Sequence, residues 1–323
     1  MNAKRNSYKN KSNKKKVKTR NRLLEKNTIK EKDNSKEICL KRKKKKLILK
    51  KKYAIVLFIL FATLSIYSVS NIIRWIFDNK NTAKELEKIN ENVEVDEVED
   101  SVNTQIINPP EEKLDNPYWD YIKMNLINVD FAQLKAQNND TAGWIQVNGT
   151  NINYPFVQTS DNSYYLKKDF NKKYNSAGWV FMDYRNNLQN FDKNTIIYAH
   201  GRINGTMFGS LKNIIESNWY SNKNNHIVKI STEYENTMWQ VFSIYRIPET
   251  SDYLKTTFND NEKYIDFLNM IQNRSEFKFD VSLNEKDKIL TLSTCYKESD
   301  RVVLHAKLIK MEVRNGNNWN FKK

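Results

Sequence analysis

The chain has 323 residues, with 54 Lys and Arg, 38 Asp and Glu, two Cys and 39% hydrophobic residues. This composition excludes collagen-like, disulfide-stapled and wholly disordered chains. The net charge of +16 is concentrated at the start, because residues 1–52 alone carry +19 and the remainder carries −3. A nucleic-acid-binding domain has its basic face on the folded part, so nucleic acid is not predicted as a partner.

The first third of the chain is predicted to form a membrane anchor. Residues 1–52 are predicted to be a basic cytoplasmic leader. Residues 53–73 carry no charge, and their number matches the roughly 20 residues that a transmembrane helix needs. The basic run Lys41–Lys52 abuts this span, so the positive-inside rule predicts a single-pass cell-membrane protein with a cytoplasmic N-terminus and an extracellular remainder. Residues 74–113 are rich in acids and are predicted to be a solvated stalk, helical over Thr82–Asn92.

Residues 114–323 are predicted to form one folded domain of mainly β structure. Apolar residues at helical spacing between Trp119 and Leu134 predict one or two amphipathic helices. Eight short apolar runs predict a sandwich or barrel; they are residues 144–147, 152–157, 178–182, 195–198, 227–230, 239–244, 288–294 and 301–313. A helix is expected at Glu262–Arg274, with an apolar stripe made of Tyr264, Phe267, Leu268 and Ile271.

The candidate nucleophile, Cys295, directly follows the seventh run. Period-two alternation puts Leu290 and Leu292 on one face of the strand and Thr291, Ser293 and Cys295 on the other. We expect the Leu face to enter the core and the polar face to line a groove. A cysteine attacks only as the thiolate, which needs a base or a cation nearby. The other cysteine, Cys39, lies across the predicted membrane span and is interpreted as incidental.

Three histidines are candidates for the base. His200 ends a predicted strand beside a loop and is the best placed of the three. His226 follows Lys-Asn-Asn and is interpreted as a solvated loop residue. His305 lies between apolar residues of the last strand and is interpreted as a core or supporting histidine.

Arg301 opens the last strand and is the candidate cation. A guanidinium keeps its charge and suits the stabilisation of an oxyanion or the binding of a carbonyl. A surface ion pair with Glu298 or Asp300 is an equal interpretation of the same residue. The sequence contains no HExxH, no CxxC pair and no Gly-rich nucleotide loop, so neither a metal nor a cofactor is expected.

These residues occur in motifs that resemble those of the sortase family. Thr291–Cys295 looks like the TLxTC signature, and Arg301–Leu308 resembles the arginine-bearing strand that follows it. Asn194–His200 with Gly205–Leu211 is similar to the histidine segment of class B sortases. The likeness extends to Ala142–Ile145, Tyr154–Gln158 and Phe181–Arg185. N-terminal helices and a long helix before the cysteine strand favour class B over class A.

The resemblance implies an eight-stranded β-barrel and a cysteine transpeptidase that anchors exported proteins to the cell wall of a Gram-positive bacterium. Cys295 is then expected to attack the carbonyl of a Thr in a C-terminal sorting signal and form a thioacyl-enzyme. His200 is expected to exchange protons with the departing and incoming amines, and Arg301 to stabilise the oxyanion or align the signal. Ser293 is a candidate substrate contact. The implied partners are sorting-signal proteins and a peptidoglycan or precursor amine.

Two alternatives stay open on sequence grounds. An exported papain-like cysteine hydrolase usually has its Cys before its His, whereas here His200 precedes Cys295. A non-catalytic, membrane-anchored binding module would keep its ligand affinity after loss of Cys295. Product formation that depends on an amine distinguishes transfer from hydrolysis.

Overall fold

The computed structural model describes residues 3–111, 116–296 and 300–314, without the side chains of residues 3–17, 49, 295 and 296. The chain divides into two units, residues 1–73 and residues 74–323. The first unit belongs to one helix, α1 (Ala3–Asn92). By length and composition α1 is the one helix of the described chain that is apolar enough to cross a membrane, and no protein buries its apolar stretch. The uncharged run 53–73 lies within this helix.

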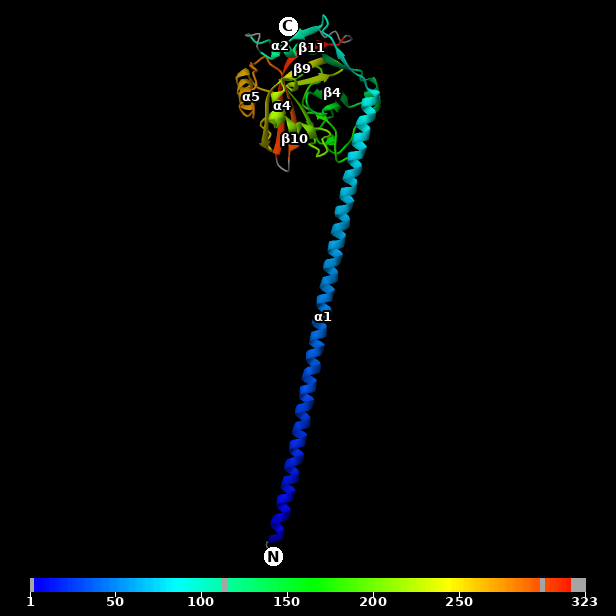
Figure 1. Ribbon diagram of the computed structural model, residues 1–323, viewed down its shortest axis with the longest axis vertical. Helices are drawn as coiled ribbons and strands as arrows, with labels where there is room; N and C mark the ends of the chain where they lie inside the picture. Colours follow the sequence, from blue (N-terminus) through cyan, green and yellow to red (C-terminus); the bar gives the residue numbers. More distant parts are fainter. Residues whose placement is uncertain (1–2, 112–115, 297–299, 315–323) are drawn as a thin grey trace. The chain divides into compact units, whose positions relative to one another are not determined.

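The second unit is built around a closed β-barrel (Figure 1). In the part of the chain that is described, its eight strands are β4 (Thr141–Val147), β5 (Asn153–Val157), β6 (Phe181–Met182), β7 (Asn194–Ala199), β8 (Ile227–Ser231), β9 (Glu235–Pro248), β10 (Ile289–Tyr296) and β11 (Asp300–Val313). They follow the order β10-β7-β6-β5-β4-β8-β9-β11, and the pairing of β10 with β11 closes the circle. Closure removes the exposed edges that an open sheet would leave unpaired. The predicted barrel is thereby confirmed, and each of the eight apolar runs supplies one strand.

Alternation along the strands separates two apolar clusters. Leu292 of β10 and Leu304 of β11 belong to the larger cluster, whereas Val303 belongs to a second cluster that lies under helix α5 (Asn261–Asn273). Asp260 caps α5, because its side chain accepts a hydrogen bond from the Lys263 backbone N–H. The predicted stripe of α5 is confirmed, since all four of its residues, Tyr264, Phe267, Leu268 and Ile271, are buried. Burying an aromatic or aliphatic side chain of this kind contributes about 1.5–3 kcal/mol.

Residues 74–111 differ from the predicted solvated stalk, because they are part of the folded unit. The last turns of α1 bury Leu86 and Ile89, and Val93 follows them into the same core. Strand β1 (Val95–Val98) pairs with β3 (Leu126–Val129), and β2 (Thr104–Ile106) pairs with the barrel strand β11. Most acidic side chains of this segment are exposed, whereas Asp78 is buried. The sparse apolar residues of the segment recur at near-helical intervals and form a buried stripe.

Between residues 116 and 140 the helices are shorter than predicted. Helix α2 covers Tyr118–Tyr121 and α3 covers Ala132–Gln137, with strand β3 between them. The partner of β3 is β1, which lies in the segment interpreted as stalk. The strand therefore depends on a pairing between distant segments, which the local pattern of apolar residues cannot predict. The remaining short helices are η1 (Tyr164–Leu166), η2 (Gly209–Ile215), α4 (Ser217–Ser221) and η3 (Lys223–Asn225).

Candidate active site

Three neighbouring strands bring the predicted site residues to one end of the barrel. Strands β7 and β10 are parallel, and their last paired residues are Ala199 and Thr294. The next residue on each strand is His200 and Cys295. On the other side of β10, Cys295 is the direct antiparallel partner of Arg301 in β11. The backbone thus places all three positions together, while the side chain of Cys295 lies outside the described part of the chain.

The two faces of β10 differ as the alternation predicts. Leu290 and Leu292 are fully buried in the larger core cluster. On the other face, Thr291 donates a hydrogen bond to Asn194 Oδ1 at 2.6 Å, and Ser293 Oγ lies 2.9 Å from the hydroxyl of Tyr253. Both polar side chains are also buried. The polar face is therefore covered at both positions, and Ser293 lines a cavity described below.

His200 is half-buried, and a backbone carbonyl orients its imidazole. Nε2 lies 2.9 Å from the carbonyl oxygen of Leu166. A carbonyl can only accept, so Nε2 carries the hydrogen of this bond. Nδ1 is therefore the ring nitrogen left for proton exchange. Leu166 is a member of the site that strand-end reasoning missed, since it lies 34 residues before the histidine.

Among the described residues, Arg301 makes an ion pair with Glu249, which the sequence did not suggest. Its Nη2 lies 2.8 Å from Glu249 Oε1, and Nη1 donates to the backbone carbonyl of Asp300 at 3.2 Å. Glu298 lies outside the described residues. The guanidinium side chain is 18% exposed whereas the Glu249 side chain is 68% exposed, so water screens the pair and it contributes little to stability. Among the described residues, Glu249 and Asp300 use only part of the five N–H donors of Arg301.

A cavity of about 540 Å³ lies between His200 and Arg301. His200, Ser293, Thr294 and Arg301 line it together with Tyr198, Tyr253 and residues 249–251 of the segment that follows β9. Asn162, Leu166, Phe181, Ala199 and Leu254 complete the lining. Tyr198 could have been found from the sequence, because it lies two residues before His200 on the same strand face. The segment 249–254 carries no such periodic signal.

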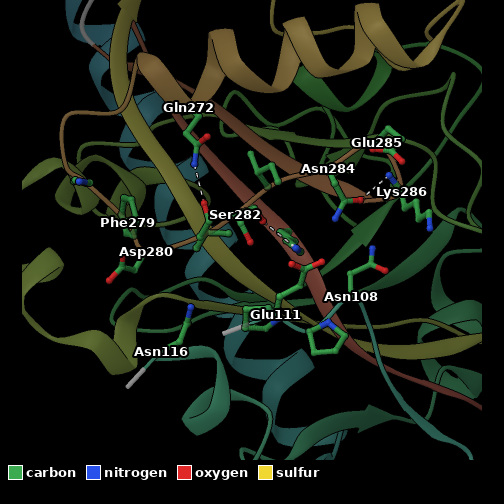
Figure 2. Close-up of a pocket in the computed structure, with 16 residues that line it drawn as sticks. Asn108, Glu111, Asn116, Gln272, Phe279, Asp280, Ser282, Asn284, Glu285 and Lys286 are labelled. Carbon is green, nitrogen blue, oxygen red and sulfur yellow. Dashed lines mark hydrogen bonds between the residues drawn. The ribbon is translucent and has the colours of Figure 1, made fainter. Parts of the chain in front are cut away.

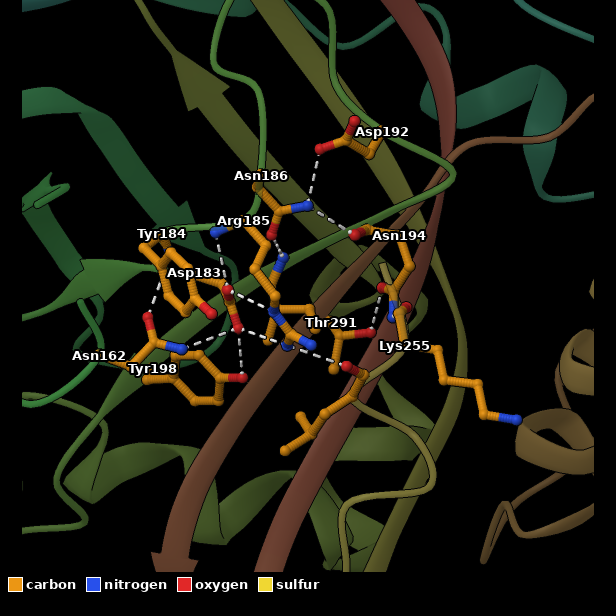
Figure 3. A network of polar contacts seen from close by, with 12 residues as sticks. Asn162, Asp183, Tyr184, Arg185, Asn186, Asp192, Asn194, Tyr198, Lys255 and Thr291 are labelled. Carbon is orange, nitrogen blue, oxygen red and sulfur yellow. Dashed lines mark hydrogen bonds and ion pairs between the residues drawn. The ribbon is translucent and has the colours of Figure 1, made fainter. Parts of the chain in front are cut away.

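A buried carboxylate holds two walls of this cavity together (Figure 3). Asp183 is fully buried and accepts hydrogen bonds from Tyr198, Asn162 and Arg185. Burial opposes its ionisation, but the bonds from Arg185 and Tyr198 outweigh burial and lower the pKa of Asp183. Arg185 also donates to the Leu254 carbonyl at 3.0 Å. The network therefore ties the strand that ends at His200 to the segment that carries Glu249.

The other two histidines lie away from this cavity. His305 is confirmed as a core residue: it is fully buried, Thr291 Oγ1 lies 2.8 Å from Nδ1, and the Tyr245 hydroxyl lies 2.9 Å from Nε2. Burial lowers its pKa to about 3. The interpretation of His226 as solvated is wrong, because the ring is buried and stacks on Tyr220. The polar run before it did not reveal that Tyr220, six residues earlier, and Phe279, from a distant segment, pack against the ring.

A second cavity, of about 940 Å³, shares no lining residue with the first (Figure 2). It lies between residues 108–111, the segment 278–286 that precedes β10, and Lys307 of β11. Lys307 is satisfied there by Asp287 and by the Ser282 carbonyl. Within the described ranges, no group of three or more His, Cys, Asp or Glu side chains is arranged to hold a metal ion.

The comparisons with known proteins agree with this architecture. A family profile described as sortase domain matches residues 145–309. Sortase B of Staphylococcus aureus is 37% identical over 185 residues, which are 56% of this chain and 75% of that protein. A crystal structure of sortase B from Bacillus anthracis covers 74% of this chain and 99% of its own, at 31% identity and a TM-score of 0.58. A sortase B structure complexed with triglycine covers 56% of this chain and 85% of its own, at 36% identity and a TM-score of 0.53.

The closed barrel and the likeness to solved sortase B structures define a cysteine transpeptidase. The chain belongs to the sortase family, and its relatives in the comparisons are class B enzymes. No feature of the described residues favours a papain-like hydrolase or a binding module.

Proposed function

We propose that this sortase cleaves a C-terminal sorting signal after a Thr and transfers the new carboxyl end to an amine of the cell wall. The observation that carries the proposal is the register that makes Cys295 the partner of Arg301 and the neighbour of the strand end at His200. A nucleophile, a proton carrier and a permanent cation from three adjacent strands are the set that acyl transfer requires.

In the first half of the reaction, Cys295 is the nucleophile. Its sulfur adds to the Thr carbonyl carbon, the peptide C–N bond breaks, and His200 gives a proton to the departing amine. Nδ1 of His200 is the nitrogen for this transfer, because Nε2 is engaged by Leu166. In the second half, the wall amine attacks the thioester carbonyl carbon, His200 accepts the amine proton, and the C–S bond breaks to return Cys295 as the thiolate.

Arg301 and Ser293 bind the substrate in this proposal. The N–H groups of Arg301 that Glu249 and Asp300 leave unused bind the oxyanion or the carbonyl of the signal. Ser293 lines the cavity and shares a hydrogen bond with Tyr253. We assign it a substrate contact that this bond orients.

The proposed partners and location follow from the anchor and the family. The donor is an exported protein with a sorting signal, and the acceptor is a primary amine of peptidoglycan or its precursor; a related sortase B has been solved with triglycine. We propose that residues 1–52 lie in the cytoplasm, that 53–73 cross the membrane, and that the unit from residue 74 onward is extracellular. A tether of this kind raises the local concentration of membrane-held substrate.

The test uses the full chain in detergent with a library of peptides that carry candidate signals. Mass spectrometry is expected to find an acyl adduct on Cys295 and, once triglycine is added, a peptide joined to its amino group. Cys295→Ala and His200→Ala are expected to abolish both products. Products formed only by water, in equal amounts with and without the amine, would indicate a hydrolase and contradict the proposal.

A further inference from the structure

The turns of α1 that precede Asn92 contact the loop that supports His200. We call residues 165–179 the supporting loop and residues 74–92 the entry helix. Both belong to the same folded unit. The entry helix therefore does more than connect the predicted membrane span to the barrel, because it contacts a loop of the candidate site.

The supporting loop meets the histidine at two places. The Leu166 carbonyl accepts the Nε2 hydrogen. The loop has two arms, residues 165–168 and 174–179. On the second arm, Gly178 has a φ of +62°, and a Cβ there would lie 2.6 Å from the Tyr165 carbonyl oxygen and 3.0 Å from His200 Cδ2. The imidazole is thus in close contact with both arms, and a small shift of either arm changes its position.

The two arms of the supporting loop are bonded to each other. Asn175 N–H donates to the Lys167 carbonyl at 3.1 Å, and Trp179 N–H donates to the Tyr165 carbonyl at 2.9 Å. Lys168 and Tyr174 form an antiparallel bridge beside the first of these bonds. Because the arms are cross-linked in this way, a displacement at Asn175 is passed to the peptide of Leu166.

The entry helix holds the loop at Asn175 and Ser176. The Asn175 side-chain amide donates to Thr82 Oγ1 at 3.0 Å, and Ser176 N–H donates to Asp78 Oδ2 at 3.1 Å. Thr82 and Asp78 are both buried, although the segment that contains them is acidic and hydrophilic in composition. Hydrogen bonds made away from water are costly to remove, because the partner is left unsatisfied.

A second connection reaches the histidine from its C-terminal side. Arg202 lies two residues after His200, and its backbone N–H donates to the His200 carbonyl at 3.1 Å. Its guanidinium binds Asn79 of the entry helix and the Ser176 carbonyl, and lies over the ring of Trp75 at 5.8 Å. The entry helix therefore contacts both the supporting loop and the segment that follows His200.

We propose that Asp78 and Thr82 are positioning residues for His200. Through them, the entry helix fixes the position of the imidazole in the active site. The inference rests on the proposed role of His200 as proton carrier. The helix keeps the Leu166 carbonyl in place, and the carbonyl keeps the hydrogen on Nε2 and Nδ1 available. Misplacement of a reacting group by about 1 Å can reduce the rate about 100-fold, so loss of the two contacts acts mainly on the chemical step.

The experiment compares variants of the full chain in detergent, with signal peptide and triglycine as substrates. Asp78→Ala combined with Thr82→Val is expected to lower kcat at least about 10-fold with KM changed less than about threefold. It is also expected to move the limb of the pH–rate profile that reports His200, because the imidazole loses its fixed acceptor. Asp78→Asn with Thr82→Ser keeps an acceptor at both positions and is expected to restore most of kcat.

Controls separate positioning from folding. Lys84→Ala and Glu87→Ala change exposed residues of the same helix and are expected to leave kcat unchanged. If the double variant unfolds, Thr82→Val alone, which keeps the side-chain shape, gives the decisive kcat and pH profile. A normal kcat per folded molecule together with an unchanged pH profile would overturn the inference. His200→Ala is run in parallel: an inactive His200→Ala beside a normal Thr82→Val rejects the positioning role alone, whereas an active His200→Ala rejects the proposed function.

Discussion

A 2.9 Å hydrogen bond joins Nε2 of His200 to the carbonyl oxygen of Leu166, although 34 residues separate the two in the chain. The bond assigns the ring hydrogen to Nε2 and makes the conformation of a loop part of the chemistry of the histidine. The segment that supports this loop begins next to the predicted membrane span.

Gly178→Ala is expected to displace the loop residues that contact the His200 imidazole. The added Cβ would meet the Tyr165 and Leu166 carbonyl oxygens at 2.6 and 2.9 Å, and the positive φ adds about 1–2 kcal/mol of strain for a residue with a side chain. We expect kcat to fall about 10-fold or more, measured by transfer to triglycine. Gly205→Ala is the matched control, since its φ is +80° but its nearest neighbour would be 3.5 Å away. Equal losses of kcat in the two variants would contradict the explanation by crowding.

Arg301→Lys is expected to reduce kcat/KM about 10- to 100-fold while the protein stays folded. A lysine keeps the charge but loses the planar fork that binds an oxygen in two places. Steady-state kinetics with the signal peptide measure the loss. Arg246→Lys serves as the control, because Arg246 also pairs with a carboxylate, that of Asp300 at 3.7 Å, and does not line the cavity. An Arg301→Lys enzyme with the parent kcat/KM would limit Arg301 to its ion pair with Glu249.

Glu85→Gln is expected to stabilise the protein at alkaline pH. Burial, and then the nearby carboxylate of Asp169, raise the pKa of Glu85 to about 7. The unfolded chain ionises this group from its ordinary pKa of 4.5 upward, so wild-type stability falls between these two values and stays lower above about pH 7. The variant is expected to gain on the order of 1 kcal/mol near pH 8 and almost nothing near pH 4. Thermal melts at the two pH values measure this, with exposed Glu87→Gln as control, and a gain that does not change with pH would contradict the assignment.

Asp183→Asn is expected to loosen the wall of the cavity. The variant cannot balance the charge of Arg185, and the Tyr198 hydroxyl loses a charged acceptor. We expect a loss of about 1–3 kcal/mol of stability near neutral pH and a higher KM for the signal peptide. Because the wild-type carboxyl has a lowered pKa, its contribution is present above its unfolded pKa and disappears as the pH falls through the folded value. The difference between the two proteins should therefore shrink in acid; chemical denaturation at several pH values tests this.

The repeating features of the fold could be predicted from the sequence because they are local. The eight apolar runs became the eight barrel strands in the described chain, and the stripe of α5 was readable because Tyr264, Phe267, Leu268 and Ile271 recur at helical intervals. Strand ends are equally local, so His200 and Cys295 could each be placed at the end of a strand. The expectation that these two ends meet needed the resemblance to a family, because residue spacing does not predict that β7 pairs with β10 in parallel.

Contacts between distant segments decided the rest. The sequence alone determined the strands, the anchor-like span and the residue types able to transfer an acyl group. Only the tertiary structure decided that the acidic segment at 74–111 packs on the barrel, that Leu166 orients His200, and that Glu249 pairs with Arg301. The physical reason is that periodicity records which face of an element is buried, whereas the identity of the neighbour on that face depends on how the whole chain closes.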